Sequence, residues 1–206
     1  MSILIIFRKT AVVNKFHKLI IDTILTGEAD EAIICSGFFQ EDLNFSSSLS
    51  TQLANSIYSK NIKLQTIGIH NGSWKLRYVK FRDNFRNLGV NIVAFVAQNY
   101  HWHAKIFILK KNGEPIFGII GSSNMTRPAF DYSSPFNFEA DVVLWNYNNQ
   151  KIDKICQSQT DLIEGENANS FIYADYNFER NGNITPMEKL KEIEKELFSS
   201  NLNLLP

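Results

Sequence analysis

The sequence predicts an α/β protein in which a mixed β-sheet is flanked by helices. In the first half, amphipathic and apolar segments alternate as helix and strand, which favours parallel strands joined by helices. Asn112-Gly113 stands between two apolar runs, the pattern of a tight antiparallel hairpin. A further apolar run, Glu139–Trp145, adds a strand to the antiparallel part, so the sheet is expected to be mixed.

Helices and strands of the first half are expected in alternation. The helices cover residues 11–27, 45–60 and 74–88, and the strands cover residues 31–35, 62–69 and 90–96. Apolar residues recur at helical spacing in the first helix, which ends at Gly27 and places His17 at the surface or half buried. Ser73 is expected to cap the third, basic helix, which Gly89 ends.

The second half contains the hairpin, a third strand and two helices. The hairpin strands are expected at His103–Lys111 and Pro115–Ser122, the third strand at Glu139–Trp145, and a helix at 149–163. Residues 166–184 show weak periodicity and are expected to be an irregular arm. Thr185-Pro186-Met187-Glu188 predicts a capped helix start, and this helix runs to about Ser199. We expect a catalytic domain over residues 1–165 and a C-terminal arm and helix over 166–206, packed on that domain or on a dimer partner.

Composition excludes several classes of protein. With 206 residues, 44% of them hydrophobic and 13% aromatic, the chain can bury a large core and is not disordered. No apolar run approaches the roughly 20 residues that a membrane span needs. The opening MSILIIF is too short for a secretion signal, and Cys35 and Cys156 are read as free buried thiols, so we expect a cytoplasmic protein.

Charge is balanced overall and uneven along the chain. The formal net charge is zero, which argues against a protein that coats nucleic acid. Between residues 60 and 111, however, Asp83 is the only acid among ten basic residues, whereas the segment after Lys151 is rich in acids. This asymmetry indicates one side that faces a polyanion, and an ordinary solvated helix face explains it equally well.

Polar residues gather where the predicted strands begin and end. His101, His103 and Lys105 alternate and can project from one face, because every second residue of a strand shares a face. Ser122, Ser123 and Asn124 close the second hairpin strand, and Glu139 opens the third. An ammonium, an imidazole, and amide and hydroxyl donors suit a phosphate, with histidine as nucleophile or general acid and base.

The order of these residues resembles the phospholipase D superfamily of HKD phosphodiesterases. His103-Ala-Lys105, Gly-Ser-Ser-Asn at 121–124 and Glu139 match the family's His-x-Lys, Gly-Ser-x-Asn and Glu elements. One departure is Lys110, which stands where the family has an Asp usually taken as structural. The resemblance implies an α/β sandwich around a mixed sheet. A short chain with a single motif is similar to the nuclease branch, including metal-independent restriction endonucleases.

The resemblance also implies roles for the site residues. His103 would attack phosphorus to form a phosphohistidine, Lys105 and Asn124 would hold the non-bridging oxygens with help from Ser122, and Glu139 would orient the His103 ring. The second histidine would come from a homodimer partner at the two-fold axis. The scheme requires no metal and no other cofactor. Further contacts to the substrate are expected from His101, Ser123, Lys110 and Arg127.

Three functions therefore stay open. The first is a metal-independent phosphodiesterase that cleaves nucleic acid, more readily DNA than RNA, and it implies no membrane partner. The second, prompted by Lys110, is a degenerate DNA-binding or assembly module, and the third is a phospholipase or phosphatidyltransferase. A metal site at His101 and His103 is the local rival, which Lys105 on the same face disfavours.

Overall fold

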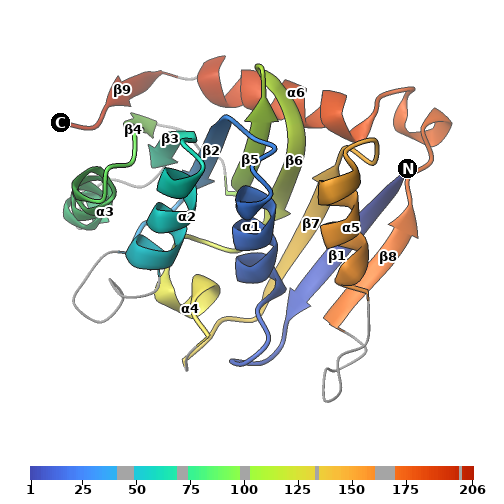
Figure 1. The fold of residues 1–206 in the computed structure, drawn as a ribbon, viewed down its shortest axis with the longest axis horizontal. Coiled ribbons are helices and arrows are strands. Elements are labelled where there is room, and N and C mark those ends of the chain that lie inside the picture. Colours follow the sequence, from blue (N-terminus) through green and yellow to red (C-terminus); the bar gives the residue numbers. More distant parts are fainter. Residues whose placement is uncertain (41–48, 69–73, 98–102, 133–134, 161–169, 200) are drawn as a thin grey trace.

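The structure is a computed structural model that describes residues 1–206 except 41–48, 69–73, 98–102, 133–134, 161–169 and 200. Within the described residues the strands form one nine-stranded sheet, in the order β8-β1-β7-β6-β5-β2-β3-β4-β9 (Figure 1). The strands are β1 (Ser2–Arg8), β2 (Glu31–Ser36), β3 (Lys63–Gly68), β4 (Ile92–Ala97), β5 (Lys105–Lys111), β6 (Glu114–Gly121), β7 (Glu139–Trp145), β8 (Phe171–Asp175) and β9 (Leu202–Leu204). β2, β3 and β4 are parallel and the other pairs are antiparallel, so the predicted mixed sheet is confirmed.

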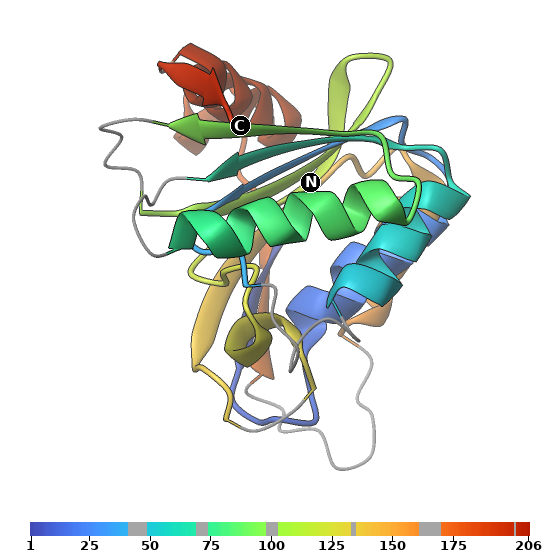
Figure 2. The same cartoon turned by 90° about the vertical axis from the view of Figure 1, so that its left-hand side faces the viewer.

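Helices cover both faces of the sheet. One face carries α1 (Lys15–Leu25), α2 (Ala54–Ser59), α3 (Lys75–Asn87) and α5 (Gln150–Ser158), and α6 (Pro186–Ser199) crosses the other face (Figures 1 and 2). The short α4 (Arg127–Phe130) lies beside the ends of the strands, a π-helical turn, Leu49–Leu53, precedes α2, and a 3-10 turn covers Glu179–Asn181. Each face has its own apolar core, one under α1, α2 and α3 and one under α6.

Helix starts follow from local capping residues. The Asn14 side chain accepts a hydrogen bond from the backbone N–H of His17 at 3.0 Å and so begins α1. At the start of α6, Glu188 accepts from the N–H and the hydroxyl of Thr185, while the Thr185 hydroxyl accepts from the N–H of Glu188. This reciprocal capping box confirms the helix start predicted at Thr185. Ser73, the predicted cap of α3, lies outside the described residues.

Three strands of the structure were not predicted from the sequence. β1 is a continuous apolar run whose period does not distinguish strand from helix. β8 lies inside the predicted irregular arm, which is therefore wrong over Phe171–Asp175, and it pairs with β1 across most of the chain length. β9 follows α6 and pairs with β4 at the other edge. The segment after residue 166 thus contributes both edge strands of the sheet and the helix on one of its faces (Figure 1).

His17 is a second correction. It is 1% exposed, not a surface residue, and its ring stacks on Phe130 with 4.2 Å between ring centroids. Nδ1 lies 2.7 Å from the carbonyl oxygen of Phe130 and Nε2 lies 2.9 Å from Oε1 of Gln52. Burial lowers the pKa of His17, so its neutral form is favoured. His17 therefore joins α1 to α4 as a core histidine.

In the described part of the chain, no helix is long and apolar enough to cross a bilayer.

Candidate active site

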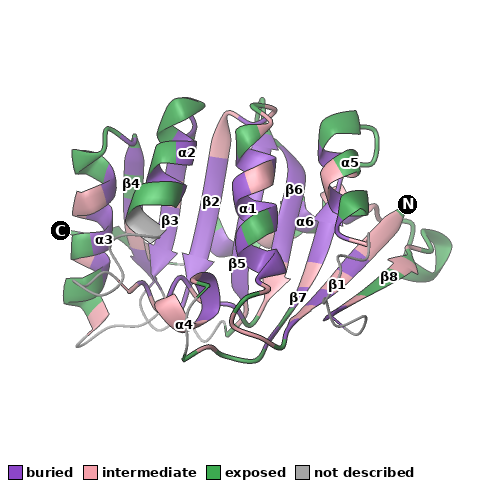
Figure 3. Cartoon of the chain, turned by 60° about the horizontal axis from the view of Figure 1, so that its bottom comes forward, coloured by how far each residue is buried: buried purple, intermediate pink, exposed green. Residues whose placement is uncertain are grey.

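Strand pairing brings the polar residues to one edge of the sheet. Lys105 at the start of β5 lies opposite Gly121 at the end of β6, and Gly121 lies opposite Asp141 of β7. Arg8 at the end of β1 lies opposite Glu139. Figure 3 turns this edge towards the viewer, with α4 beside it. We call the following residues the strand-end cluster: Arg8, Lys105, Ser122, Asn124, Glu139 and Asp141.

Lys105, like Arg8, is a buried cation of the cluster. Lys105 is 8% exposed, and its Nζ donates to the backbone carbonyl oxygen of His103 at 2.7 Å. Burial lowers the pKa of Lys105, and the negative charges of Glu139 and Asp141 act in the opposite direction. An ammonium group has three hydrogens to donate, and one of them is used within the described residues. The others remain for an anion.

Asn124 presents its amide nitrogen because a loop occupies its oxygen. Oδ1 accepts from the backbone N–H of Phe38 at 3.1 Å and from the hydroxyl of Ser36 at 3.2 Å. A backbone N–H can only donate, so this contact identifies the amide oxygen and leaves Nδ2 on the other side. Nδ2 has no acceptor among the described residues. Asn124 is therefore a fixed donor beside the end of β6.

Glu139 is held by two side chains. Ser122 Oγ donates to Oε2, and Asn137 Nδ2 donates to Oε1 at 3.0 Å. Ser122 also links the two strands, since its Oγ accepts from the backbone N–H of Ala140 at 3.0 Å. The carboxylate is 8% exposed and is electrostatically coupled to Arg8 and Lys105. Its position is fixed before any substrate arrives.

Asp141 is a cluster residue that sequence reasoning missed. It is 2% exposed, accepts from the backbone N–H of Ser123 at 3.1 Å and from the Ser123 hydroxyl at 2.6 Å, and so fixes the turn that carries Asn124. A Cβ on Gly121 would stand 2.1 Å from Oδ1 of Asp141, which explains the glycine. The sequence spacing could have indicated Asp141, because Glu139 and Asp141 are two residues apart on one strand and therefore share a face.

Arg8 was also missed, because it ends a strand that was not predicted. Its guanidinium donates to the carbonyls of Pro128 at 2.9 Å and Ala129 at 2.6 Å, and to that of Asp131. Asn14 donates to the carbonyls of Ala129 and Phe130, both at 2.9 Å. These bonds satisfy the carbonyl groups of a helix too short to satisfy its own. Arg8 therefore holds α4 against the cluster.

His103 stands at the mouth of the cluster. It precedes β5 and is exposed, although the predicted strand included it, and its ring has no hydrogen bond within the described part of the chain. The expected hydrogen bond from its ring to Glu139 is not formed, and the two carboxylate oxygens accept from Ser122 and Asn137. Likewise, the Ser122 hydroxyl donates to Glu139 and is not turned to a substrate. The imidazole is free to turn.

Of the four residues expected to contact substrate, three are described, and none of these three belongs to the strand-end cluster. Ser123 is 2% exposed and both its N–H and its hydroxyl bind Asp141, so it supports the turn. Lys110 lies on the other face of the sheet. Arg127 is half-buried and begins α4, where its backbone N–H donates to Gln40 at 3.1 Å. His101 lies outside the described residues, so its role stays a prediction.

Lys110 ties α6 to the sheet. Its Nζ lies 2.5 Å from Oε1 of Glu194 on α6 and 3.3 Å from Oε2 of Glu31 on β2. It is five residues along β5 from Lys105, roughly 17 Å at the rise of a strand, and faces the opposite side. These carboxylates raise the pKa of Lys110 despite its burial. The residue that departs from the family pattern is thus structural, and it does not touch the cluster.

Lys110→Ala is expected to lower the free energy of unfolding by about 1–3 kcal/mol, because Glu31 and Glu194 would lose their shared cation. Urea unfolding at pH 7 measures the change. Lys111→Ala is the matched control, since Lys111 is exposed and its contact with Asp30 is 3.6 Å long. Equal stability of the two variants would contradict the role given to Lys110.

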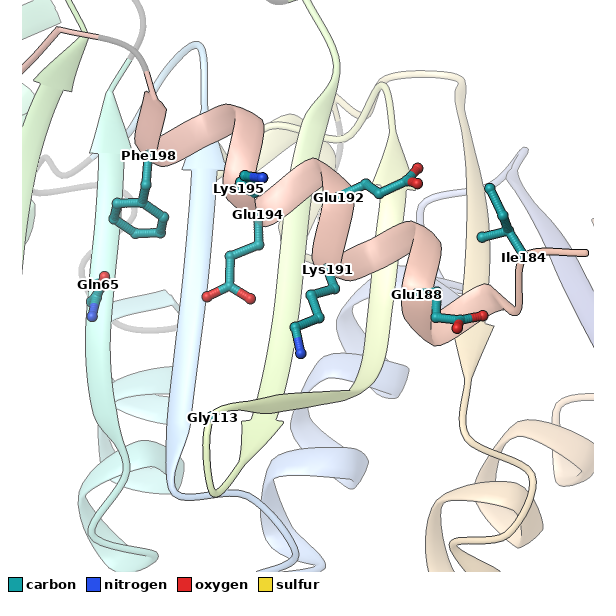
Figure 4. Close-up of a pocket in the computed structure, with 9 residues that line it drawn as sticks. All are labelled: Gln65, Gly113, Ile184, Glu188, Lys191, Glu192, Glu194, Lys195 and Phe198. Carbon is teal, nitrogen blue, oxygen red and sulfur yellow. The ribbon is translucent and has the colours of Figure 1, made fainter. Parts of the chain in front are cut away.

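A groove of about 810 Å³ lies away from the cluster. Figure 4 shows it between α6 and the sheet, with Phe198 at one end and Ile184 at the other, and its lining includes Gln65 and Gly113. None of the cluster residues lines it. Among the described residues, no group of three or more histidine, cysteine, aspartate and glutamate side chains is arranged to hold a metal ion.

Comparisons with known proteins identify a family and similar folds. The profile of the family described as "NgoFVII restriction endonuclease N-terminal PLD domain" matches residues 14–168. Among solved structures, phosphatidylserine synthase from Haemophilus influenzae is similar at a TM-score of 0.50 and 13% identity, over 97% of this chain and 46% of that one. Polyphosphate kinase from Porphyromonas gingivalis has a TM-score of 0.46 and 10% identity, over 80% of this chain and 27% of that one.

A mutant of the yeast tyrosyl-DNA phosphodiesterase has a TM-score of 0.44 and 12% identity, over 68% of this chain and 45% of that one. This chain thus spans less than half the length of each of these three structures. Among curated proteins, none matches. The likeness to phosphatidylserine synthase, at a TM-score of 0.50, concerns the fold alone.

Proposed function

The chain belongs to the family of the NgoFVII restriction endonuclease N-terminal PLD domain, and we propose that it hydrolyses phosphodiester bonds of nucleic acid, DNA in preference to RNA, without a metal ion. The observation that carries this proposal is a pair of unused donors beside a histidine. Lys105 Nζ and Asn124 Nδ2 lie at the edge where His103 enters the sheet, and neither is saturated within the described residues. Two fixed donors and an imidazole suit a phosphodiester.

The reaction proceeds in two balanced steps. A ring nitrogen of His103 attacks phosphorus, a P–N bond forms, and the bond to the leaving oxygen breaks as that oxygen takes up a proton. Water then attacks the phosphohistidine and gives a proton to the group that protonated the leaving oxygen, the P–N bond breaks, and the phosphate product leaves. Lys105 and Asn124 hold the non-bridging oxygens, where negative charge is greatest in both transition states. When the imidazole turns inward, Glu139 is the carboxylate that stabilises its positive form.

The leaving oxygen must receive its proton from a general acid other than His103. Among the described histidines, His103 is consumed as the nucleophile, and both ring nitrogens of His17 face Phe130 and Gln52 in the core. His70 and His101 lie outside the described residues. Since the chain carries one copy of the His-x-Lys motif, we assign the second histidine to His103 of an identical chain, so that two clusters face each other across a two-fold axis. A homodimer with one composite site is part of the proposed function.

The proposal predicts cleavage of plasmid DNA in excess EDTA at a rate equal to that in Mg²⁺, because charge stabilisation comes from Lys105 and Asn124. Plasmid, single-stranded DNA, RNA and phosphatidylcholine vesicles are incubated in parallel, with His103→Ala protein as the blank. A requirement for divalent ions would contradict the mechanism. Hydrolysis of the lipid alone would identify a phospholipase, and DNA binding without turnover would identify a non-catalytic module.

A further inference from the structure

The outer face of α3 carries four cations without acidic partners. They are Lys75, Arg77, Lys80 and Arg86, which are exposed and form no ion pair within the described chain. The one acid of α3, Asp83, contacts Arg82 at 2.8 Å. By contrast, two lysines of α6 are paired with acids, Lys189 with Glu192 and Lys191 with Glu114. Unpaired cations on one helix face indicate an anionic partner.

A series of contacts connects this face to the strand-end cluster. The guanidinium of Arg77 lies over the ring of Trp74, with 4.6 Å between its central carbon and the ring centroid. The Trp74 ring lies 4.6 Å from that of Phe38, tilted by 54°. Phe38 in turn donates its backbone N–H to Asn124 at 3.1 Å. Arg77 is therefore held at a defined place relative to the amide that binds the reacting phosphate.

A held guanidinium is a stronger phosphate ligand than a free one. Side-chain ordering costs about 0.5–1.5 kcal/mol per long side chain at an interface, and Trp74 imposes much of that order on Arg77 before binding. The planar group keeps its donors for two oxygens of one phosphate while its face rests on the indole. Lys80, three residues after Arg77, adds charge on the same side of the helix. Figure 2 shows α3 extending from the strand ends along the sheet, and so away from the cluster.

We propose that Arg77, supported by Trp74 and accompanied by Lys80, binds a backbone phosphate of the nucleic acid on the α3 side of the one that is cleaved. The inference rests on the proposed function for the identity of its ligand. Because Arg77 already covers the Trp74 ring, the contact uses phosphate charge and leaves the bases untouched. The surface consequently binds duplex DNA of any sequence, and its contribution depends strongly on salt.

The test measures DNA binding in a background that does not cleave. A fluorescent 30-base-pair duplex is titrated with His103→Ala protein and with the same protein carrying Arg77→Ala, Arg77→Lys or Lys154→Ala, from 50 to 300 mM NaCl. Lys154 is the matched control, because it is exposed on α5, at the far end of the sheet from α3 (Figure 1). Circular dichroism confirms that each variant is folded.

Arg77→Ala is expected to bind about 5- to 10-fold more weakly at 100 mM salt, with the slope of log affinity against log salt reduced by about 1. Two unrelated DNA sequences should show the same loss. Arg77→Lys should keep the slope and bind about 2- to 3-fold more weakly, since it loses the indole contact. Lys154→Ala should bind like the parent.

The outcomes separate this inference from the proposed function. If wild-type protein cleaves DNA in EDTA while Arg77→Ala binds with unchanged affinity and slope, the function stands and the α3 surface is wrong. If nothing is cleaved while Arg77→Ala still weakens binding, the surface stands and the catalytic proposal is wrong. An equal loss in Lys154→Ala would show general attraction to a charged protein and would overturn the proposed contact.

Discussion

His103→Ala is expected to reduce DNA cleavage in EDTA by about 10⁴-fold or more, because the reaction loses the atom that forms the P–N bond. The loss should appear in the single-turnover rate with labelled duplex DNA. Affinity for the duplex should change little, since Lys105 and Asn124 remain. Stability should also change by no more than about 0.5 kcal/mol, because His103 is exposed and its ring makes no hydrogen bond within the described chain.

Two controls make this prediction specific. Lys63→Ala removes an exposed cation where β3 begins, at the ends of the strands opposite the strand-end cluster. This variant should cleave at the wild-type rate. Added imidazole should restore part of the activity of His103→Ala, because a free ring can enter the space that the side chain leaves. A variant that retains more than about 1% of the wild-type rate would exclude His103 as the nucleophile.

The same variant examines the composite site. When His103→Ala and wild-type protein are mixed and allowed to exchange subunits, a site that needs both histidines is active only in wild-type homodimers. Activity should then fall as the square of the wild-type fraction at constant total protein. A linear fall would mean that each chain works alone, and the second histidine would have to be sought in this chain.

Local signals made part of the fold predictable. The Asn112-Gly113 turn and the apolar runs beside it specify the hairpin without reference to the rest of the chain. The strand from Glu139 to Trp145 was predicted with its observed bounds. β1, β8 and β9 have no such signal, because each becomes a strand only by pairing with a segment that is distant in sequence.

The candidate site was predictable only as far as residue type and spacing reach. Lys105, Asn124 and Glu139 stand next to turns or strand ends, so their meeting at one edge follows from the strand order. Arg8 needed β1, and Asp141 needed the register that sets it against Gly121. Lys110 and Ser123 carry polar groups and were therefore expected at the substrate. In the structure each side chain is instead bonded to a carboxylate of the protein, Lys110 to Glu194 and Ser123 to Asp141. Sequence spacing does not reveal such partners.

The stability of the folded chain should depend strongly on pH through Asp141. Burial raises the pKa of Asp141 to about 6, from an ordinary value of 3.8, although the hydrogen bonds from Ser123 oppose this shift. The folded chain thus binds this proton more tightly than the unfolded chain. Stability from this group is full below about pH 4 and is lost as pH rises to about 6. The loss at pH 7 is about 3 kcal/mol.

Asp141→Asn should remove this loss, because the amide resembles the protonated acid and can bond to the N–H and the hydroxyl of Ser123. Its melting temperature should equal that of wild type near pH 4 and exceed it by roughly 5–10 °C at pH 7. Thermal unfolding between pH 4 and 8 measures the difference, and Asp175→Asn, at an exposed carboxylate on β8, should show none of it.

Cleavage provides the complementary measurement. The Asp141 carboxylate lies on the same strand face as Glu139, and its negative charge raises the pKa of Lys105, so its ionised form helps to keep the ammonium that holds the phosphate protonated against the effect of burial. Asp141→Asn should therefore cleave more slowly at pH 7 while being more stable, the exchange expected when a costly buried charge serves the reaction. A variant that is both more stable and fully active would assign Asp141 to the turn at Ser123 alone.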